Sequence, residues 1–487
     1  MGSGDGLTAP AISPLRGYQC WLFLLGAVLL WPGLIHGDVF VFNDTISYLR
    51  GADTLFLKAF GHHDSFFAGH GAAAPAGSGA SESGQSMVLY GRSLYFGLFL
   101  YTGFLTGSLW VPVVAQALAA GAVLVALVRH FVDPAQESAF LRACCAVFAL
   151  AALTPLPYFV CYLMPDLTVG LALPAIALLL TGWRRERKAW RLGLLALALF
   201  AALAHSTAVA VFLLFGAAAL LVAGWTRSRQ LAIPAALVLL ATLGGLGGEA
   251  AFGLASRLTT GMDPVRPPFL VARLIEDGPA RRFQREHCAT ARFVLCRYPI
   301  EGKVTAEIFM WSPTRPTGGF KALPVADAVQ LSREQVRFVI AVARAYPLDT
   351  AAVLARDIAR LATNLSMEEF RPEYLSSAMR PDTLLEAVPP GTPLPLTLRV
   401  VPTLTALLVI AGLLALAWVA RARLPAGHKR LVFIVGAEIA ANDVICACLS
   451  GPFARYNTRV IWALPLIVLL AVLASRNRAG EVPAVDT

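Results

Sequence analysis

The sequence predicts an all-α polytopic membrane protein with about ten transmembrane helices and a mostly helical extracytoplasmic domain. Hydrophobic residues make up 57% of the 487 residues and charged residues only 14%, with a mean hydropathy of +0.66. Soluble domains carry about 25% charged residues, so a soluble fold is excluded. Apolar stretches approach the roughly 20 residues that cross a bilayer. The expected spans are 18–36, 109–130, 141–155, 166–183, 190–204, 207–224, 230–250, 396–420, 431–449 and 459–475.

Charge and cysteine content exclude several classes of protein. The net charge of +10 comes from Lys and Arg between the apolar stretches, which indicates contact with anionic membrane lipid rather than nucleic acid. The eight cysteines lie mostly in apolar runs and form no CxxC pairs, which argues against a zinc ribbon, an iron–sulfur protein or a disulfide-knit scaffold.

The basic residues also predict the orientation, because short loops rich in Lys and Arg stay in the cytoplasm. With ten spans and both termini inside, every basic cluster falls on the cytoplasmic side of an inner (plasma) membrane. Arg16 precedes the first span, and since no A-x-A-like cleavage site follows, we expect this span to be retained. The clusters are Arg184, Arg185, Arg187, Lys188 and Arg191; Arg227 and Arg229; Arg421, Arg423, Lys429 and Arg430; Arg476 and Arg478.

This topology divides the chain into three parts. Residues 1–250 form an N-terminal transmembrane module with a first extracytoplasmic loop at 37–108, and residues 396–487 form a C-terminal one. Residues 251–395 between them carry helical periodicity at 335–345 and 348–364 and are expected outside.

Two segments of the expected outer loops differ in composition from the rest. Residues 88–107 are apolar enough to span. An additional span here would, however, move the later basic clusters to the other side of the membrane, so we expect a juxtamembrane or re-entrant helix. Residues 61–86 have the composition of a mobile loop. Cys288 and Cys296 are able to pair in an oxidising compartment.

The first outer loop contains the leading candidate for catalysis. Asp44 and Tyr48 are four residues apart in an amphipathic stretch at 46–59, so on a helix they share a face. A carboxylate there can act as a general base. Alternatively, Asn43 or Asp44 caps this helix.

An acidic residue just after the first span, a following Tyr, many spans and a large outer segment resemble the GT-C superfamily of membrane glycosyltransferases. The resemblance implies a polyprenyl-phosphate-linked sugar donor and a lipid, glycan or protein acceptor in the cell envelope. It also implies that Asp44 is the catalytic base, with Asp38 as the alternative position. Asp166 is the candidate for the second acidic motif of the family, although the same residue after Pro165 fits the start of a helix.

The resemblance does not decide whether the protein binds a cofactor. A single Asp at position 166 does not provide a pair of acidic metal ligands, and a divalent metal remains possible. His62, His63, Asp64 and His70 have no recognised ligand spacing and are not expected to bind metal.

Stabilising a leaving phosphate calls for cations, and Arg offers a planar fork of donors. Three arginines in the outer loops are candidates, and neighbouring aromatic residues and one histidine are assigned to substrate binding with them. Alternatives are headgroup anchoring for the Arg and Tyr residues and a helical-hairpin tip for the histidine. The candidates are Tyr48, Arg92, Tyr95, His205, Arg455, Tyr456 and Arg459.

Two rival functions remain open. Glu438, Asn442 and Asp443 lie within an expected span, where acids are costly and often functional. They fit a transporter or flippase for a lipid-linked envelope precursor, or an interhelical polar contact. The third possibility is a non-catalytic subunit of envelope-polymer assembly, which would depend on surfaces of 251–395.

Overall fold

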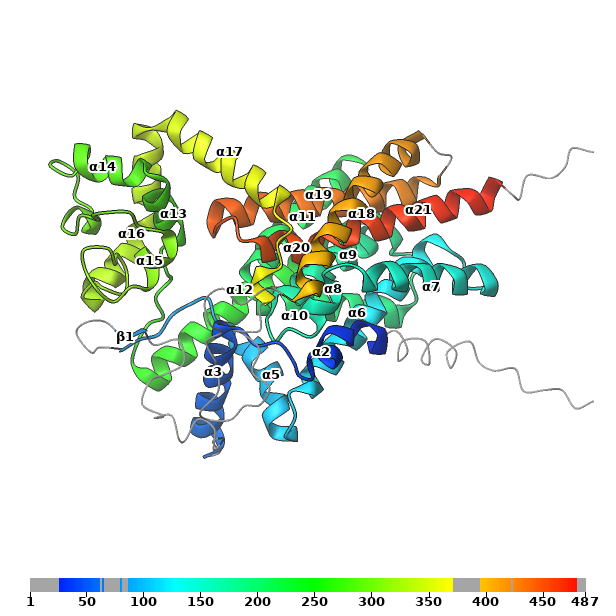
Figure 1. The fold of residues 1–487 in the computed structure, drawn as a ribbon, viewed down its shortest axis with the longest axis horizontal. Helices are drawn as coiled ribbons and strands as arrows, with labels where there is room; N and C mark the ends of the chain where they lie inside the picture. The colour runs from blue at the N-terminus through cyan, green and yellow to red at the C-terminus, as the bar shows by residue number, and fades with distance from the viewer. Residues whose placement is uncertain are drawn as a thin grey trace, which may run out of the picture.

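The computed structural model describes residues 26–61, 64, 79–80, 86–370, 395–421 and 424–479, and in them it is helical (Figure 1). Its only described strands are two short ones, β1 (Gly79–Ala80) and β2 (Ser86–Met87), which pair antiparallel. The helices are α2 (Trp31–His36), α3 (Asn43–Phe60), α5 (Leu94–Thr106), α6 (Trp110–Phe131), α7 (Glu137–Ala152), α8 (Leu156–Val160), α9 (Asp166–Gly182), α10 (Lys188–Ala204), α11 (Ser206–Trp225), α12 (Arg229–Thr260), α13 (Phe269–Asp277), α14 (Pro279–His287), η1 (Val294–Cys296), α15 (Ala306–Trp311), α16 (Val325–Ala345), α17 (Pro347–Thr363), η2 (Glu368–Phe370), α18 (Leu396–Arg421), α19 (Ala426–Leu449), α20 (Ala454–Ile461) and α21 (Ala463–Ala479).

Six helices in the described part are long and apolar enough to cross a membrane, which confirms a helical membrane protein. They are α6, α11, α12, α18, α19 and the continuous pair α20 and α21. The expected number of ten is not confirmed. Helices α7, α9 and α10 have only 16, 17 and 17 residues, and residues 18–25 of the first expected span lie outside the described residues.

Helix α9 lies at the centre of the transmembrane bundle. Almost all of its residues are buried, and it packs against α6, α10, α19 and α20. Gly170 permits a close contact with α20, because a Cβ atom at this position would lie 2.2 Å from the carbonyl oxygen of Arg459. From Val169 to Leu180 the sequence of α9 is apolar, because every side of the helix faces protein.

The two ends of α9 have different surroundings. At its C-terminal end, Glu186 lies 3.6 Å from Arg129 at the end of α6, and His130 lies 5.4 Å, ring to ring, from His428 at the start of α19. At its N-terminal end, Asp166 meets the α10–α11 turn and α20. The basic turn between α9 and α10 is therefore at the opposite end of the bundle from Asp166.

Helix α5 occupies the segment for which a juxtamembrane or re-entrant helix is expected. Its 13 residues are about 20 Å long, which is too short to cross a bilayer. It packs closely on α3, since a Cβ atom at Gly97 would lie 2.3 Å from the backbone oxygen of Tyr48. The close packing holds the residues before α5 against the first turn of α3.

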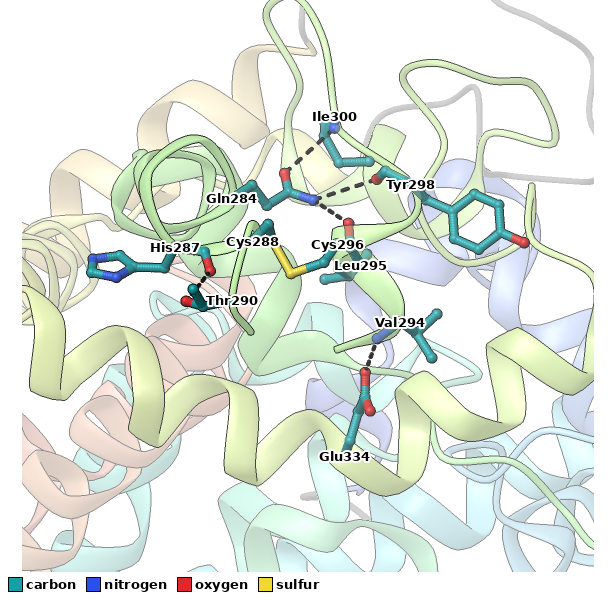
Figure 2. Close-up of a disulfide and its surroundings, with 10 residues drawn as sticks. All are labelled: Gln284, His287, Cys288, Thr290, Val294, Leu295, Cys296, Tyr298, Ile300 and Glu334. Atoms are coloured by element: carbon teal, nitrogen blue, oxygen red, sulfur yellow. Dashed lines mark hydrogen bonds between the residues drawn. A yellow bond between two sulfur atoms is a disulfide. The ribbon is translucent and has the colours of Figure 1, made fainter. Parts of the chain in front are cut away.

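A second hydrophobic core lies in the segment from Val265 to Tyr346, which we call the outer domain. It contains α13 to α16 and stands at the left of Figure 1. The Cys288–Cys296 disulfide confirms the expected pairing and closes a loop beside α14 (Figure 2). Around it, Gln284 donates to the backbone oxygen of Leu295 at 2.8 Å.

Helix α17 connects the outer domain back to the transmembrane bundle, after a bend of 111° from α16. Arg273 on α13 is buried and forms ion pairs with Asp277 (3.0 Å) and with Asp357 on α17. At the other end of α17, Leu361 packs with Tyr456. Helix α17 thus fixes the outer domain to the bundle through a buried ion pair and an apolar contact.

Candidate functional site

Backbone pairing brings the start of α3 next to the start of α9. The N–H of Phe40 donates to the oxygen of Cys161 at 2.8 Å, and the N–H of Leu163 donates to the oxygen of Phe40 at 2.9 Å. The hydroxyl of Thr45 accepts the N–H of Phe42 at 3.0 Å and donates to the oxygen of Leu163 at 3.0 Å. Two segments more than 100 residues apart in sequence therefore meet at one point.

Asp44 lies in the first turn of α3 and forms an ion pair with Arg92, which comes from the turn before α5. The side chains are 21% and 26% exposed, so a ligand can reach this pair. The expectation that Asn43 or Asp44 caps the helix is wrong, because α3 begins at Asn43 and Phe42 is its N-cap residue. Asp44 remains favourably placed near the positive end of the helix dipole.

Asp38 has different surroundings. Its carboxylate accepts the backbone N–H of Val39 at 2.7 Å, and burial raises the pKa of the carboxyl group. No ion pair to Asp38 occurs among the described residues. Of the two acids considered at the sequence level, Asp44 is the one that faces a guanidinium.

Arg459 is the centre of a buried network at the start of α9. Its guanidinium donates to Asp166 at 3.0 Å and to Asn442 at 2.9 Å, and it lies 3.2 Å from Nε2 of His205. Arg459 and Asp166 are 0% and 2% exposed, so this ion pair is closed to solvent. His205 also caps α11, because its Nδ1 accepts the N–H of Thr207 at 3.1 Å.

Arg455 lies one helical turn before Arg459 on α20 and forms an ion pair of 2.7 Å with Glu369. Its guanidinium lies 5.0 Å from the ring of Phe42 and 5.1 Å from that of Tyr456, distances typical of cation–π contacts. Glu369 is held there by the next residue, Phe370, which is buried in a cluster of aromatic rings.

These groups act on one another. Burial raises the pKa of the Tyr48 phenol; the charges of Asp44 and Asp166 raise it further, whereas those of Arg92 and Arg455 lower it. The exposed pair and the buried network therefore belong to one site, which we call the polar cluster. Its members are Asp44, Tyr48, Arg92, Asp166, His205, Glu369, Asn442, Arg455, Tyr456 and Arg459.

Tyr95 lies apart from the polar cluster. Its hydroxyl donates to the backbone oxygen of Gly248 on α12 at 3.0 Å, so it joins two helices. Tyr48 is a member, but its ring is buried edge-on against Phe96, at 5.5 Å between centroids. Tyr48 therefore supports the site more than it presents a surface to a ligand.

Glu369 was missed by the sequence analysis. It lies after α17 and 86 residues before Arg455 in sequence, and the anchoring of Phe370 brings it to the cluster. The acidic pair Glu368 and Glu369 before an aromatic residue is the sole sequence signal, and by itself it indicates no partner.

Each carboxylate of Asp44, Asp166 and Glu369 faces a guanidinium. No group of three or more His, Cys, Asp or Glu side chains converges on a metal position within the described ranges. His62, His63 and His70 lie outside those ranges. The arrangement can bind an anion if one guanidinium exchanges its carboxylate for the ligand, and the exposed Asp44–Arg92 pair can do this most readily.

An apolar pocket of about 250 Å³ lies between α6 and α10, lined by residues that include Ala119, Val123, Trp190 and Leu194. It opens along the half of α10 that is away from His205. Its lining suits an aliphatic chain rather than a polar group.

Comparisons with known proteins give no relative for this chain. No protein-family model, no curated protein and no solved structure matches it.

Proposed function

We propose that this protein is a glycosyltransferase of the GT-C type, which moves a sugar from a polyprenyl-phosphate donor to a hydroxyl group of an envelope lipid, glycan or protein. The observation that carries the proposal is the Asp44–Arg92 ion pair. It places a partly exposed carboxylate against a partly exposed guanidinium at the mouth of a membrane bundle. A base and a phosphate ligand are the two groups that this reaction needs.

In the proposed reaction the donor enters between Asp44 and Arg92 and separates them. The phosphate takes the place of the carboxylate on Arg92, and the sugar then lies between the two side chains. Asp44 removes the proton of the acceptor hydroxyl, whose oxygen forms a bond to the anomeric carbon. The bond from that carbon to the phosphate oxygen breaks, and the electron pair leaves with the phosphate, which Arg92 stabilises.

The remaining members of the cluster have supporting roles in this proposal. Asp166 and Arg459 are closed to solvent, so we assign them to positioning α9 against α20 rather than to contact with the reacting atoms. Arg455 is 14% exposed and its partner Glu369 is 24% exposed, so Arg455 is available as a second phosphate ligand. No step in the proposal needs a metal ion.

We further propose that the site faces the extracytoplasmic side of the inner membrane. Two observations support this. The basic turn 183–188 is at the opposite end of α9 from Asp166, and short basic loops favour the cytoplasm. The outer domain carries a disulfide, which persists in an oxidising compartment. Labelling of single cysteines placed at exposed Leu348 and Trp225 with a membrane-impermeant reagent tests the orientation: Leu348 should react in intact cells and Trp225 only after lysis.

The function is tested by comparing envelope glycolipids and polysaccharides by mass spectrometry in a deletion strain and in the same strain complemented with the wild-type gene. Loss of one sugar from a defined acceptor, restored by complementation, supports the transferase and identifies its sugar. An unchanged profile in the deletion strain would contradict the proposal.

One observation favours a transporter or flippase as the second candidate. Glu438 in α19 is 0% exposed, and neither carboxylate oxygen has a hydrogen-bond partner among the described residues. If transport is the function, Glu438→Gln should abolish movement of a lipid-linked precursor that depends on the proton gradient. A transferase should keep its sugar transfer when the gradient is collapsed in membrane vesicles.

A further inference from the structure

Two helices, α6 and α10, line the apolar pocket of about 250 Å³, and neither fills it. Small side chains leave the space open: Ala119 and Ala122 on α6 and Ala189 and Gly193 on α10 are part of its wall. A Cβ atom added at Gly193 would lie in open space, with no atom of a neighbouring element within 4 Å. Since α6 and α10 both pack against α9, that helix sets the distance between them.

The pocket lies at the basic end of the bundle and within the depth of one leaflet. Its α10 residues run from Ala189, next to the start of the helix, to Leu197, which is about 12 Å of helix. One leaflet of the hydrocarbon core is about 15 Å thick. Leu192 and Leu199 on the same helix are exposed, so this part of α10 faces lipid. An aliphatic chain of that leaflet can therefore enter the pocket from the side.

A guanidinium lies beside the wall of the pocket. The guanidinium carbon of Arg129, at the end of α6, is 4.8 Å from the ring of Trp190, which lines the pocket. Arg129 is also 3.6 Å from the carboxylate of Glu186, which is longer than a hydrogen bond. The Nε atom of Arg129 has no hydrogen-bond partner in the part of the chain that the structure describes. Arg129 therefore has donor capacity left for a ligand.

The charge around this end of the pocket favours an anion. The basic turn 183–188 carries one acid, Glu186, and four cations, which are Arg184, Arg185, Arg187 and Lys188. An excess of positive charge at a membrane surface attracts anionic headgroups. Trp and Arg occur at membrane interfaces in general, but here they adjoin a preformed apolar pocket.

We propose that the pocket binds one acyl chain of an anionic phospholipid, with the phosphate of the headgroup on Arg129. Trp190 lies at the boundary between chain and headgroup, which is where Trp side chains concentrate in membranes. The lipid belongs to the leaflet at the basic end of the bundle, whereas Asp166 and the polar cluster lie at the other end of α9. The inference is therefore independent of the proposed function.

The test titrates the purified full-length protein in detergent with phosphatidylglycerol or with phosphatidylethanolamine of the same acyl chains, and measures bound lipid by native mass spectrometry. Gly193→Leu fills the pocket from α10, and Ala122→Leu fills it from α6. Gly224→Leu is the matched control, because it adds the same side chain at another exposed glycine whose Cβ would lie in open space. The double variant Arg129→Gln with Glu186→Gln removes both charges and leaves neither buried alone.

Wild-type protein should bind phosphatidylglycerol about tenfold more tightly than phosphatidylethanolamine, because the basic turn repels the ammonium of the second lipid. Gly193→Leu and Ala122→Leu should weaken both lipids about tenfold, which is the effect of removing roughly two methylene groups from an apolar site. The double variant should also weaken both about tenfold, since each lipid has a phosphate that loses a charged donor. Gly224→Leu should bind both lipids as the wild type does.

Two results would overturn the inference. Wild-type affinity in both Gly193→Leu and Ala122→Leu would show that no acyl chain occupies the pocket. Equal binding of the two lipids by the wild-type protein would contradict an anionic headgroup.

A further arm separates a phospholipid from the lipid-linked donor. Farnesyl phosphate, a short polyprenyl phosphate that stands in for the donor, is measured with the same variants in phosphatidylcholine nanodiscs. Gly193→Leu should bind it as the wild type does, because the proposed donor site is at the other end of the bundle. If Gly193→Leu loses farnesyl phosphate and keeps phosphatidylglycerol, the pocket holds the donor tail and the inference of a phospholipid is wrong.

Discussion

The buried ion pair between Asp166 and Arg459 is expected to contribute strongly to the stability of the bundle. If one of the two charges is removed, the other should destabilise the bundle, because it stays buried without a counter-charge. The substitution Asp166→Asn retains the shape of the side chain and removes its charge. Arg459 is 0% exposed, so it would keep a buried positive charge with no counter-charge. Breaking a buried ion pair in this way costs about 3–5 kcal/mol.

The structure places the expected cost at the low end of that range. After the substitution, Arg459 would still donate to Asn442 at 2.9 Å and lie 3.2 Å from His205. We therefore expect Asp166→Asn to lower the free energy of unfolding by about 3 kcal/mol. Arg459→Met should cost a similar amount, because it leaves the carboxylate buried.

The double variant is the more informative one. With both charges removed, no unpaired charge is left in the core, so the double variant should be about 2 kcal/mol more stable than the sum of the single effects predicts. Unfolding is followed in mixed detergent micelles at increasing mole fraction of sodium dodecyl sulfate. Asp263→Asn is the control, because it breaks an exposed pair with Arg257 and should cost below about 1 kcal/mol. Additive effects of the two substitutions would refute the reasoning.

Three other predictions follow from contacts in the fold. Gly97→Ala places a methyl group against the backbone oxygen of Tyr48, so it should cost about 1–3 kcal/mol in the same unfolding assay and weaken farnesyl phosphate binding; wild-type values for both would contradict the close packing. Replacing Cys288 and Cys296 with Ser should lower the stability of the outer domain by about 2–3 kcal/mol, seen as faster amide hydrogen exchange in α14, and equal protection would contradict it. Tyr95→Phe should cost about 1 kcal/mol of stability through one lost hydrogen bond and leave farnesyl phosphate binding unchanged, whereas a loss of binding would return Tyr95 to the site.

Hydropathy predicted the long membrane helices correctly, since a run such as 207–224 has no other way to bury its surface. It was less informative for short helices. Residues 141–155 and 166–183 read as spans because they are apolar, but α9 is apolar mainly because protein surrounds it on all sides. Apolar composition alone does not separate a lipid-facing helix from one at the centre of a bundle.

Part of the polar cluster was predictable and part was not. Asp44, Arg92, Arg455 and Arg459 stand out because charged residues are rare next to spans, and their placement on one side of the topology predicted that they would meet. The choice of partners was not predictable, because each pair joins distant segments.

The central claim is that Asp44 is the base and Arg92 the phosphate ligand of a sugar transfer. It is tested most directly with Asp44→Asn, by measuring sugar transfer in the complemented deletion strain and farnesyl phosphate binding in nanodiscs, at matched protein abundance and beside Asp38→Asn. We predict that Asp44→Asn abolishes transfer and binds farnesyl phosphate at least as tightly as the wild type, because Arg92 loses its competing carboxylate. Asp38→Asn should retain transfer. An Asp44→Asn protein that restores the full envelope profile would contradict the account.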